Sequence, residues 1–415
     1  MAKENYTLEQ KCRICSSTNL TMILDLGEQP PANSFVDQNE LNFSEPKFPL
    51  RLFWCTDCYL VQLLDIVDKE YLFKNYFYMT SASKPIVDHF KKYAQDVYQE
   101  FLQEVNNPFV VEIGSNDGSL LKEFKKLNTQ ILGIEPATNL SDLANHSNIT
   151  TKNTFFSSQV SKEIVKSGNA SVVVANNVIA HVKDLQDLMH GIEILIGNTG
   201  VFIFEVPYLV DLIKKLEFDT IYHEHLSYFS ILPLLKLVEQ FGLEIFDIRK
   251  QSVHGGTLRI FVSKQNNFEV SSIIDDFINS EYEMGLNKNL IYNTFSEKIK
   301  NLKIQLKELL IELKKEKKSL FGYGASAKGN VLLNYCKIDN TILDFIIDTT
   351  PTKQGKYTPG THIPVYSPDK ILGKGEESIA LLLAWNYKSQ ILDKENQFRT
   401  NGGKFLLPIP KPELI

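Results

Sequence analysis

Residues 109–120, FVVEIGSNDGSL, run from an apolar, β-branched stretch through a loop bounded by Gly114 and Gly118 into the start of a helix. Similar apolar runs separated by helical stretches follow, namely TQILGIEP, SVVVANN and GVFIFEVP, within residues 129–207. Buried β-branched strands that alternate with helices are typical of a parallel sheet covered on both faces. We therefore predict an α/β domain over residues 81–283.

The glycine-bounded loop predicts the position of a cofactor. Glycines let a ligand approach the backbone, and the N-terminus of the following helix favours polar or anionic groups. The next strand ends in Glu135, about twenty residues on, where a carboxylate accepts hydrogen bonds from both ribose hydroxyls. These features indicate an adenosine-type cofactor. The cofactor contacts that we predict are Glu112, Gly114, Ser115, Asn116, Asp117, Gly118, Glu135, Phe155, Asn176 and Asn177.

NAD is the competing interpretation, but residues 115–117, Ser-Asn-Asp, interrupt the G-x-G-x-x-G fingerprint that a dinucleotide requires. A loop with an acidic side chain and no phosphate nest suits a cationic sulfonium better than a pyrophosphate. The sequence therefore favours S-adenosylmethionine (SAM). Asn153, Phe155 and Phe156 follow the next strand position and are candidates to flank the adenine, although core packing explains the phenylalanines equally well.

Two cysteine pairs precede this domain, Cys12 with Cys15 and Cys55 with Cys58. Each C-x2-C pair can direct two thiolates at one ion, and four thiolates complete a tetrahedral zinc site. The separation between the pairs is longer than the usual ~15–20 residues. Since four thiolates leave no open position on the metal, we predict a structural zinc in a small N-terminal domain over residues 1–80.

A long helix leads into a third region. Its apolar side chains recur at steps of three and four among lysine- and glutamate-rich faces, which predicts packing against a neighbouring domain. These side chains are Ile291, Phe295, Ile299, Leu302, Leu306, Leu309 and Leu313. Strand and helix patterns then alternate again in SLFGYG, LDFIID and SIALLLAWN. We predict a second α/β domain over residues 284–415.

Residues 221–229, IYHEHLSYF, gather two histidines, a carboxylate and two tyrosines. Metal binding explains them less well, because H-E-x-x-H ligands lie four residues apart on a helix, whereas His223 and His225 are two apart. General acid–base chemistry fits better, since histidine titrates near neutrality. His181 follows the strand SVVVANN, at the end where α/β proteins bind ligands; a histidine satisfied within the core is the alternative.

The length and composition of the chain limit the classes of protein to which it can belong. The chain has 415 residues, enough for two or three domains, of which 43% are hydrophobic and 23% charged. Its formal net charge of -6 argues against nucleic acid as a partner. No apolar run approaches the ~20 residues that span a bilayer, and MAKENYTLEQK has no hydrophobic signal core. We expect a cytoplasmic enzyme without a membrane partner, as a monomer or weak homo-oligomer.

Several motifs, in their order along the chain, resemble the sugar C-methyltransferases of deoxysugar biosynthesis: ANSF (residues 32–35), GSNDGSLL, GIEPA, YHEHLSYFS, HGGTLRIFV, GYGASAKGN and LLPIPKPELI. The resemblance spans nearly the whole chain. It implies a zinc-bearing N-terminal domain, a central Rossmann-like SAM methyltransferase domain and a C-terminal Rossmann-like domain, with the active site between them. It also implies methylation at C-3 of a 4-keto-6-deoxy sugar carried on a nucleoside diphosphate.

Carried over residue by residue, the resemblance makes His225 the general base and the four cysteines the zinc ligands. Around the reacting carbon it places Glu224, Tyr222, His181 and Tyr76, with Tyr78 an alternative to the last. The substrate contacts that we predict are Asn33, Tyr78, His254, Ser326 and Lys328. The last two lie in the turn GYGASAKG, whose glycine spacing departs from the dinucleotide fingerprint. One interpretation is that they bind a diphosphate, and the alternative is a tight turn without a ligand.

The predicted chemistry requires a nucleophilic carbon. A ketone supplies one when a base removes the neighbouring proton to give an enolate. We expect His225 to be that base and Tyr222, His181 or Tyr76 to stabilise the enolate oxygen, without a catalytic metal. One alternative is an O-methyltransferase acting on a nucleotide sugar. Another is a zinc-ribbon binding protein with degenerate α/β domains, against which the residue 222–225 cluster and the intact cofactor loop argue.

Overall fold

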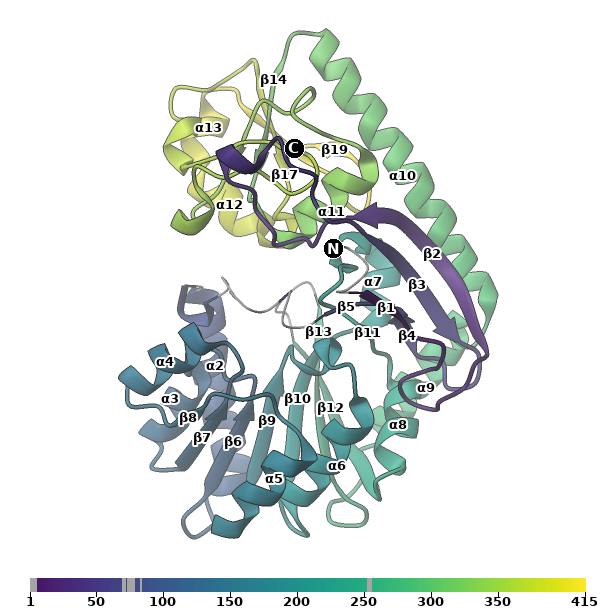
Figure 1. Ribbon diagram of the computed structural model, residues 1–415, viewed down its shortest axis with the longest axis vertical. Helices are drawn as coiled ribbons and strands as arrows, with labels where there is room; N and C mark the ends of the chain where they lie inside the picture. Colours follow the sequence, from purple (N-terminus) through teal and green to yellow (C-terminus); the bar gives the residue numbers. More distant parts are fainter. Residues whose placement is uncertain (1–5, 69–71, 73–78, 83, 252–255) are drawn as a thin grey trace.

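The structure is a computed structural model that describes residues 6–68, 72, 79–82, 84–251 and 256–415. These residues form sheets of two, four, seven and six strands. Figure 1 shows the seven-stranded sheet below the six-stranded sheet, with the N-terminal strands beside them along helix α10, Asn289–Lys315. None of the described helices is both long and apolar enough to cross a membrane.

A seven-stranded sheet forms the central region, from β6 (Phe109–Ile113), β7 (Gln130–Ile134), β8 (Thr151–Lys152), β9 (Val172–Asn176), β10 (Val201–Pro207), β12 (Leu243–Gln251) and β13 (Thr257–Lys264). The strand order is β12-β13-β10-β9-β6-β7-β8. Neighbours pair in parallel except around β13, which is antiparallel to both β10 and β12. The first five strands thus follow the Rossmann order 3-2-1-4-5, which puts the switch point between β6 and β9.

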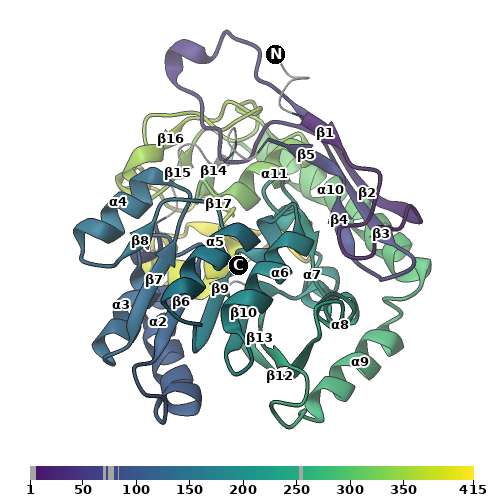
Figure 2. The same cartoon turned by 60° about the horizontal axis from the view of Figure 1, so that its bottom comes forward.

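Successive residues of these strands enter two different cores, as the side-chain period of two requires. Val110 and Val174 pack with helices α2 and α3, whereas Val111 and Val173 pack with α5 and α6. Figure 2 shows α5 and α6 in front of the sheet, which confirms the predicted α/β fold covered on both faces. The helices of this region are α2 (Lys84–Val97), α3 (Ser119–Lys126), α4 (Thr138–His146), α5 (Ser158–Ile164), α6 (Leu185–Ile196), α7 (Leu209–Lys215), α8 (Ile231–Glu239) and α9 (Ile273–Met284).

The N-terminal region is built from short antiparallel strands, β1 (Tyr6–Leu8), β2 (Leu20–Gln29), β3 (Phe48–Cys55), β4 (Val61–Leu63) and β5 (Asp65–Val67). Its four-stranded sheet has the order β11-β4-β3-β2. Strand β11, Ser227–Tyr228, comes from the segment in which we predict the catalytic residues, and it pairs with β4. This predicted catalytic segment, residues 221–229, therefore contributes a strand to the N-terminal sheet and also belongs to the central region.

The C-terminal region holds a second Rossmann-like sheet, from β14 (Ser319–Tyr323), β15 (Ile346–Ile347), β16 (Val365–Tyr366), β17 (Ser378–Leu382), β18 (Lys404–Leu407) and β19 (Glu413–Leu414). The order is β16-β15-β14-β17-β18-β19, and only the β18–β19 pair of these described strands is antiparallel. Its switch point lies between β14 and β17. Its helices are α11 (Ala327–Cys336), α12 (Lys388–Lys394) and α13 (Asn396–Thr400).

Helix α10 packs on both outer regions, and most of the predicted apolar stripe is buried. Tyr292 and Leu310 are buried in place of Ile291 and Leu309, which are only partly covered. The ring centroid of Tyr292 lies 5.1 Å from that of Trp54 on β3. Contact with the N-terminal sheet therefore determines which face of α10 is buried. The predicted divisions at residues 80 and 283 stay predictions.

The N-terminal region also contacts the C-terminal one directly. The side-chain amide of Asn330 on α11 donates to the carbonyl of Ala32 at 2.7 Å. Val36 forms a β-bridge with Tyr357. The segment between β2 and β3 thus reaches the C-terminal region, and Figure 1 shows it lying against that region.

Candidate active site

A cavity of about 1210 Å³ lies where the three regions meet. Arg13 lines it from the N-terminal region, Glu112 and His225 from the central region, and Lys328 and Tyr387 from the C-terminal region. It adjoins both switch points, because residues after β6, β9, β14 and β17 contribute to its wall. This is where open α/β sheets bind ligands.

The loop after β6 approaches the cavity closely. Gly114 has a φ of 67°, and a Cβ atom there would lie 2.4 Å from Cγ2 of Val178, so no larger residue fits. Glu135 at the end of β7 accepts backbone hydrogen bonds from Asn116 at 2.9 Å and from Ala137 at 2.8 Å. Its carboxylate therefore fixes the loop while it lines the cavity.

Two buried carboxyls, those of Glu112 and Glu135, line this part of the cavity, and a bound cation would offset the cost of ionising them. Burial, together with the charges of Asp117 and Glu135, raises the pKa of Glu112 well above its ordinary value. Burial also raises the pKa of Glu135. Oε2 of Glu112, Oγ of Ser115 and both polar side-chain atoms of Asn176 lack a hydrogen-bond partner among the described residues. These buried acceptors and donors suit the sulfonium, amino and carboxylate groups of SAM.

Three of the predicted cofactor contacts lie elsewhere. Asp117 and Gly118 are not among the residues that line the cavity. The Asp117 carboxylate accepts from the backbone N–H of Ser81 at 2.8 Å and from the hydroxyl of Ser119 at 2.6 Å, so it holds the loop rather than facing a sulfonium. The Asn153 amide likewise donates to the carbonyls of Glu135 and Pro136. Gly114, Ser115, Asn116, Phe155, Phe156, Asn176 and Asn177 do line the cavity.

The segment after the short helix Phe218–Thr220 places His225 in the cavity wall. Nδ1 of His225 lies 3.0 Å from the carbonyl oxygen of Thr220, and Nε2 lies 2.8 Å from the hydroxyl oxygen of Tyr222. A carbonyl can only accept, so Nδ1 carries the proton and donates it. In the neutral ring, Nε2 is then the acceptor for the hydroxyl of Tyr222 and the atom able to take up a proton.

His181 and Glu224 lie beside His225. The ring centroids of His181 and His225 are 4.7 Å apart, and burial lowers the pKa of His181 to about 4, so its imidazole is neutral near pH 7. Burial raises the pKa of Glu224 to about 7, while a hydrogen bond from Asn33 at 2.7 Å lowers it. Asn33 was predicted to contact substrate, but it does not line the cavity, and its amide holds this carboxyl instead.

His223 does not share a metal site with His225. Its Nε2 lies 3.3 Å and 3.2 Å from the carbonyls of Phe48 and Pro49 on β3. Burial lowers the pKa of His223 to about 4. The ring therefore fastens the catalytic segment to the N-terminal sheet.

A buried ionic cluster in the cavity wall escaped the sequence analysis. Glu205 at the end of β10 accepts from Nε2 of His89 at 2.9 Å and from Nη2 of Arg259 at 2.8 Å. Burial would raise the pKa of Glu205, but the hydrogen bonds and charges of His89 and Arg259 lower it below its ordinary value. The signal was present in VFIFEVP, where a carboxylate interrupts an apolar strand run close to its carboxyl end.

In the C-terminal region, Ser326 and Lys328 line the cavity, and their contact with a diphosphate stays a prediction. Several polar groups of the turn already form hydrogen bonds within the protein. The Ser326 hydroxyl accepts from the N–H of Gly329 at 3.0 Å as the cap of α11. The N–H of Ala325 donates to Asp348 at 2.6 Å. Nζ of Lys328 lies 5.0 Å from the centroid of the Trp385 ring. Burial raises the pKa values of Glu217 and Asp219, and the charge of Lys328 partly offsets this effect.

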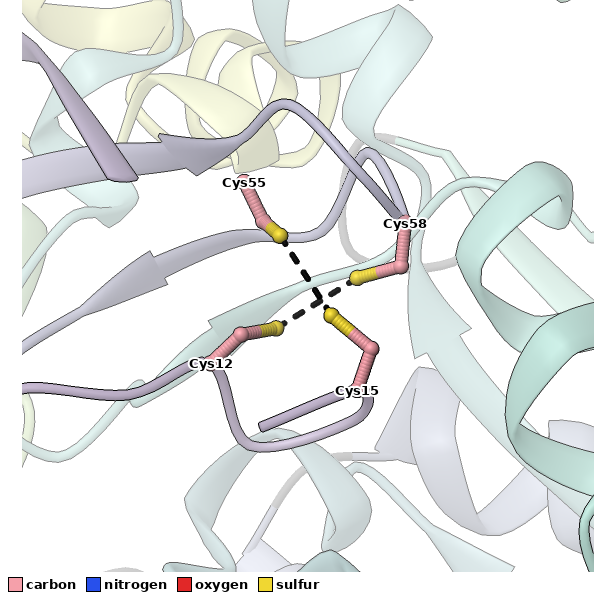
Figure 3. Close-up of side chains that lie close together, drawn as sticks. All are labelled: Cys12, Cys15, Cys55 and Cys58. Carbon is pink, nitrogen blue, oxygen red and sulfur yellow. Dashed lines mark hydrogen bonds between the residues drawn. The ribbon is translucent and has the colours of Figure 1, made fainter. Parts of the chain in front are cut away.

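Four cysteines meet as predicted in the N-terminal region. Sγ of Cys12 lies 3.3 Å from that of Cys58, and Sγ of Cys15 lies 3.5 Å from that of Cys55 (Figure 3). All four sulfurs lie within 4.8 Å of one another. Sulfurs that bind one zinc ion tetrahedrally lie about 3.8 Å apart, so the donor set fits zinc. Among the described residues, no other group of three or more histidine, cysteine, aspartate or glutamate side chains is arranged to hold a metal ion.

Three predicted site residues, Tyr76, Tyr78 and His254, lie outside the described residues. Their roles around the substrate stay predictions.

Comparisons with known sequences cover the three regions in turn. Profiles of a zinc binding domain, of a methyltransferase domain and of the C-methyltransferase C-terminal domain match residues 12–73, 87–248 and 252–410. The C-methyltransferase NovU of Streptomyces niveus is 34% identical over 407 residues, which are 98% of this chain and 96% of that protein.

Comparisons with solved structures match only part of the chain. Magnesium protoporphyrin IX methyltransferase of Synechocystis PCC 6803 with bound SAM is 13% identical, and the match covers 44% of this chain and 82% of that one at a TM-score of 0.32. The glycopeptide N-methyltransferase MtfA complexed with SAM is 10% identical, covering 42% of this chain and 93% of that one at a TM-score of 0.34. Scores this low say nothing about substrate or mechanism.

Proposed function

The chain belongs to the SAM-dependent C-methyltransferases, and from this premise we propose that it methylates a nucleoside-diphosphate-linked 4-keto-6-deoxy sugar at C-3. The observation that carries the proposal is the hydrogen bonding of His225. Its Nδ1–H donates to the carbonyl of Thr220, so Nε2 carries no proton in the neutral ring. Nε2 lies at the cavity wall, where it accepts from the hydroxyl of Tyr222. A neutral imidazole in this tautomer is the base that enolate formation requires.

In the proposed reaction, the Tyr222 hydroxyl turns from Nε2 of His225 toward the ketone oxygen, and the freed Nε2 removes the proton from the carbon next to the ketone. The electrons of the broken C–H bond form the enolate, whose oxygen needs a donor. Tyr222 and neutral His181 lie beside His225 and are the candidate donors. When bound, SAM supplies a methyl carbon that is electrophilic because it is attached to a sulfonium. Glu112, Glu135 and the loop after β6 would hold SAM, which would give its methyl group to the enolate carbon while the sulfur keeps the electron pair.

The size and lining of the cavity support a two-part substrate. Its volume of about 1210 Å³ exceeds the ~300–1,000 Å³ of single-ligand pockets, so it has room for a cofactor and a nucleotide sugar together. The cofactor part lies at the switch point of the seven-stranded sheet. Lys328 lies at the opposite wall, where an ammonium can pair with the diphosphate. We place the protein in the cytoplasm, where such sugar nucleotides are available.

The test is a mass-spectrometric screen in which purified protein, SAM and nucleotide-linked 4-keto sugars are incubated together. We expect a gain of one methyl group, which NMR locates on carbon C-3. A methyl group on oxygen would instead identify an O-methyltransferase. No transfer to any 4-keto sugar, with SAM bound, would refute the proposed substrate class.

A further inference from the structure

The backbone of Leu226, the residue after His225, forms hydrogen bonds with Ala180 of the central region and with Leu63 and Arg13 of the N-terminal region. Its N–H donates to the carbonyl of Ala180 at 2.7 Å. Its carbonyl accepts from the N–H of Leu63 at 2.9 Å and from Nη1 of Arg13 at 2.7 Å. The Leu226 N–H belongs to the planar peptide unit that contains Cα of His225, and the Leu226 carbonyl belongs to the next unit, so these three hydrogen bonds restrain the backbone that carries the His225 side chain.

Arg13 brings the zinc module into this network. It follows Cys12 directly, inside the first cysteine pair, and its side chain is buried. Its guanidinium also donates to the carbonyl of Leu63 and, at 3.2 Å, to Oε1 of Gln62. All of these acceptors are neutral, so the hydrogen bonds orient the guanidinium without neutralising its charge.

Arg13 lies between Cys12 and Cys15 in the sequence, so it is part of the loop that carries two of the four zinc-binding thiolates. A zinc ion with four thiolates carries a double negative charge, whereas four protonated thiols carry none. A buried charge without an opposite charge nearby is costly. Zinc therefore both shapes the loop that carries Arg13 and supplies the charge that keeps the guanidinium buried.

We propose that Arg13 is a positioning residue through which the zinc centre holds His225 in place; this rests on the proposed role of His225 as the base. The second cysteine pair supports the same segment. Val61, three residues after Cys58, pairs with Tyr228 between β4 and β11. Loss of zinc thus affects the segment of residues 221–229 at two of its attachments to the N-terminal region, the Arg13 contact and the β4–β11 pairing.

The test uses full-length, zinc-loaded protein with Arg13→Lys and Arg13→Met. Lysine keeps the charge but has one donor nitrogen in place of the planar fork, and methionine removes the charge as well. The matched control is Lys236→Met on α8, because Lys236 also contacts the zinc module, at the carbonyl of Asp57 and over the Tyr59 ring, but through a contact that does not involve Leu226.

In Arg13→Lys we expect bound zinc and SAM affinity to be retained, while kcat falls by at least about tenfold with KM for the sugar nearly unchanged. Hydrogen–deuterium exchange should become faster in the peptide that covers residues 220–229. Arg13→Met should show the same pattern more strongly, and Lys236→Met should match the wild type in both readouts.

Wild-type exchange in residues 220–229 and wild-type kcat in Arg13→Lys would overturn the proposal, whether or not Arg13→Met folds. The exchange readout needs no substrate. If the wild type methylates no keto sugar, the proposed function fails, while faster exchange in Arg13→Lys still shows that Arg13 positions the segment.

Discussion

Asn33 donates a hydrogen bond of 2.7 Å to Oε1 of Glu224 and so joins the segment after β2 to the catalytic segment. Burial nevertheless raises the pKa of Glu224 to about 7, because the one hydrogen bond offsets only part of the lost hydration. Near neutral pH this carboxyl is therefore present in both protonation states. Its protonated form can donate to a substrate oxygen, a role that an ordinary glutamate could not fill.

Glu224→Gln should make stability less dependent on pH. In the unfolded chain a glutamate titrates near about 4.3, whereas Glu224 in the folded protein titrates at about 7. Between these values the folded state holds the extra proton, so the wild type loses stability as pH rises through this window. Glutamine does not ionise, and the variant should gain up to about 3 kcal/mol on the wild type by pH 8.

Urea unfolding at pH 5 and pH 8 measures this difference. The control is Glu239→Gln, an exposed position on α8, which should follow the wild type at both pH values. A difference between Glu224→Gln and the wild type that is the same at pH 5 and pH 8 would contradict the buried, titrating carboxyl.

Zinc content should depend on each cysteine of the cluster. Cys12→Ser and Cys55→Ser each remove one of four sulfurs that lie within 4.8 Å of one another, so both should lose metal and fold poorly. Cys336→Ser is the control, because Cys336 is buried in α11, away from the cluster. Elemental analysis of freshly purified protein should give one zinc per chain for the wild type and for the control. Wild-type protein free of zinc would refute the site.

Glu135→Ala should weaken SAM binding. Loss of hydrogen bonds to a charged group costs about 1.5–3 kcal/mol, or roughly 10- to 150-fold in affinity. The structure adds a second reason, since the carboxylate also holds the backbone of Asn116 in the loop. Calorimetry with SAM measures the effect, and Asp142→Ala, exposed on the neighbouring α4, should bind normally. Equal affinity in both variants would remove Glu135 from the cofactor site.

Lys328→Ala should act on the sugar nucleotide and leave the cofactor alone. Lys328 lines the cavity at the C-terminal wall, with its Nζ above the Trp385 ring. We expect KM for the nucleotide sugar to rise about tenfold, as for a lost charge-assisted contact, while SAM affinity is unchanged. Lys337→Ala, at the exposed end of α11, is the control. Weaker SAM binding with a normal KM for the sugar would mean that this wall belongs to the cofactor.

The local sequence was enough to predict the parts of the fold whose signals are local. The apolar runs around Val111 and Val173 became β6 and β9, and the two C-x2-C pairs came together as one cluster. Side-chain period and ligand spacing act over a few residues, which is why reading the chain one stretch at a time recovers them.

The contacts that assemble the site are long-range, and no local pattern contains them. Arg13 reaches the carbonyl of Leu226 across 213 positions of the chain, and Asn33 reaches Glu224 across 191. Asp117 is a further example, since an acidic residue in a cofactor loop predicts a ligand contact, and in the structure its carboxylate accepts hydrogen bonds from two backbone N–H groups. Which partner satisfies a polar side chain depends on the tertiary arrangement.

His225→Asn should remove the base and leave the rest of the site in place. Asparagine can still hydrogen-bond to the carbonyl of Thr220 or to the hydroxyl of Tyr222, but it cannot take up a proton near pH 7. General-base catalysis contributes about 10²–10⁴-fold, so turnover should fall by at least that range. SAM affinity should stay close to that of the wild type, because the cofactor contacts that we predict lie at the ends of β6, β7 and β9.

Proton exchange gives a second readout that needs no methyl donor. Wild-type protein should exchange the α-proton of the keto sugar with deuterated water, and His225→Asn should not. His190→Asn is the matched control, because His190 is half-exposed on α6, where its only described ion pair is with Glu193 at 3.8 Å. Turnover and exchange at the wild-type rate in His225→Asn would exclude His225 as the base. Glu224, with its pKa of about 7, would then be the first residue to test, and His181 the second.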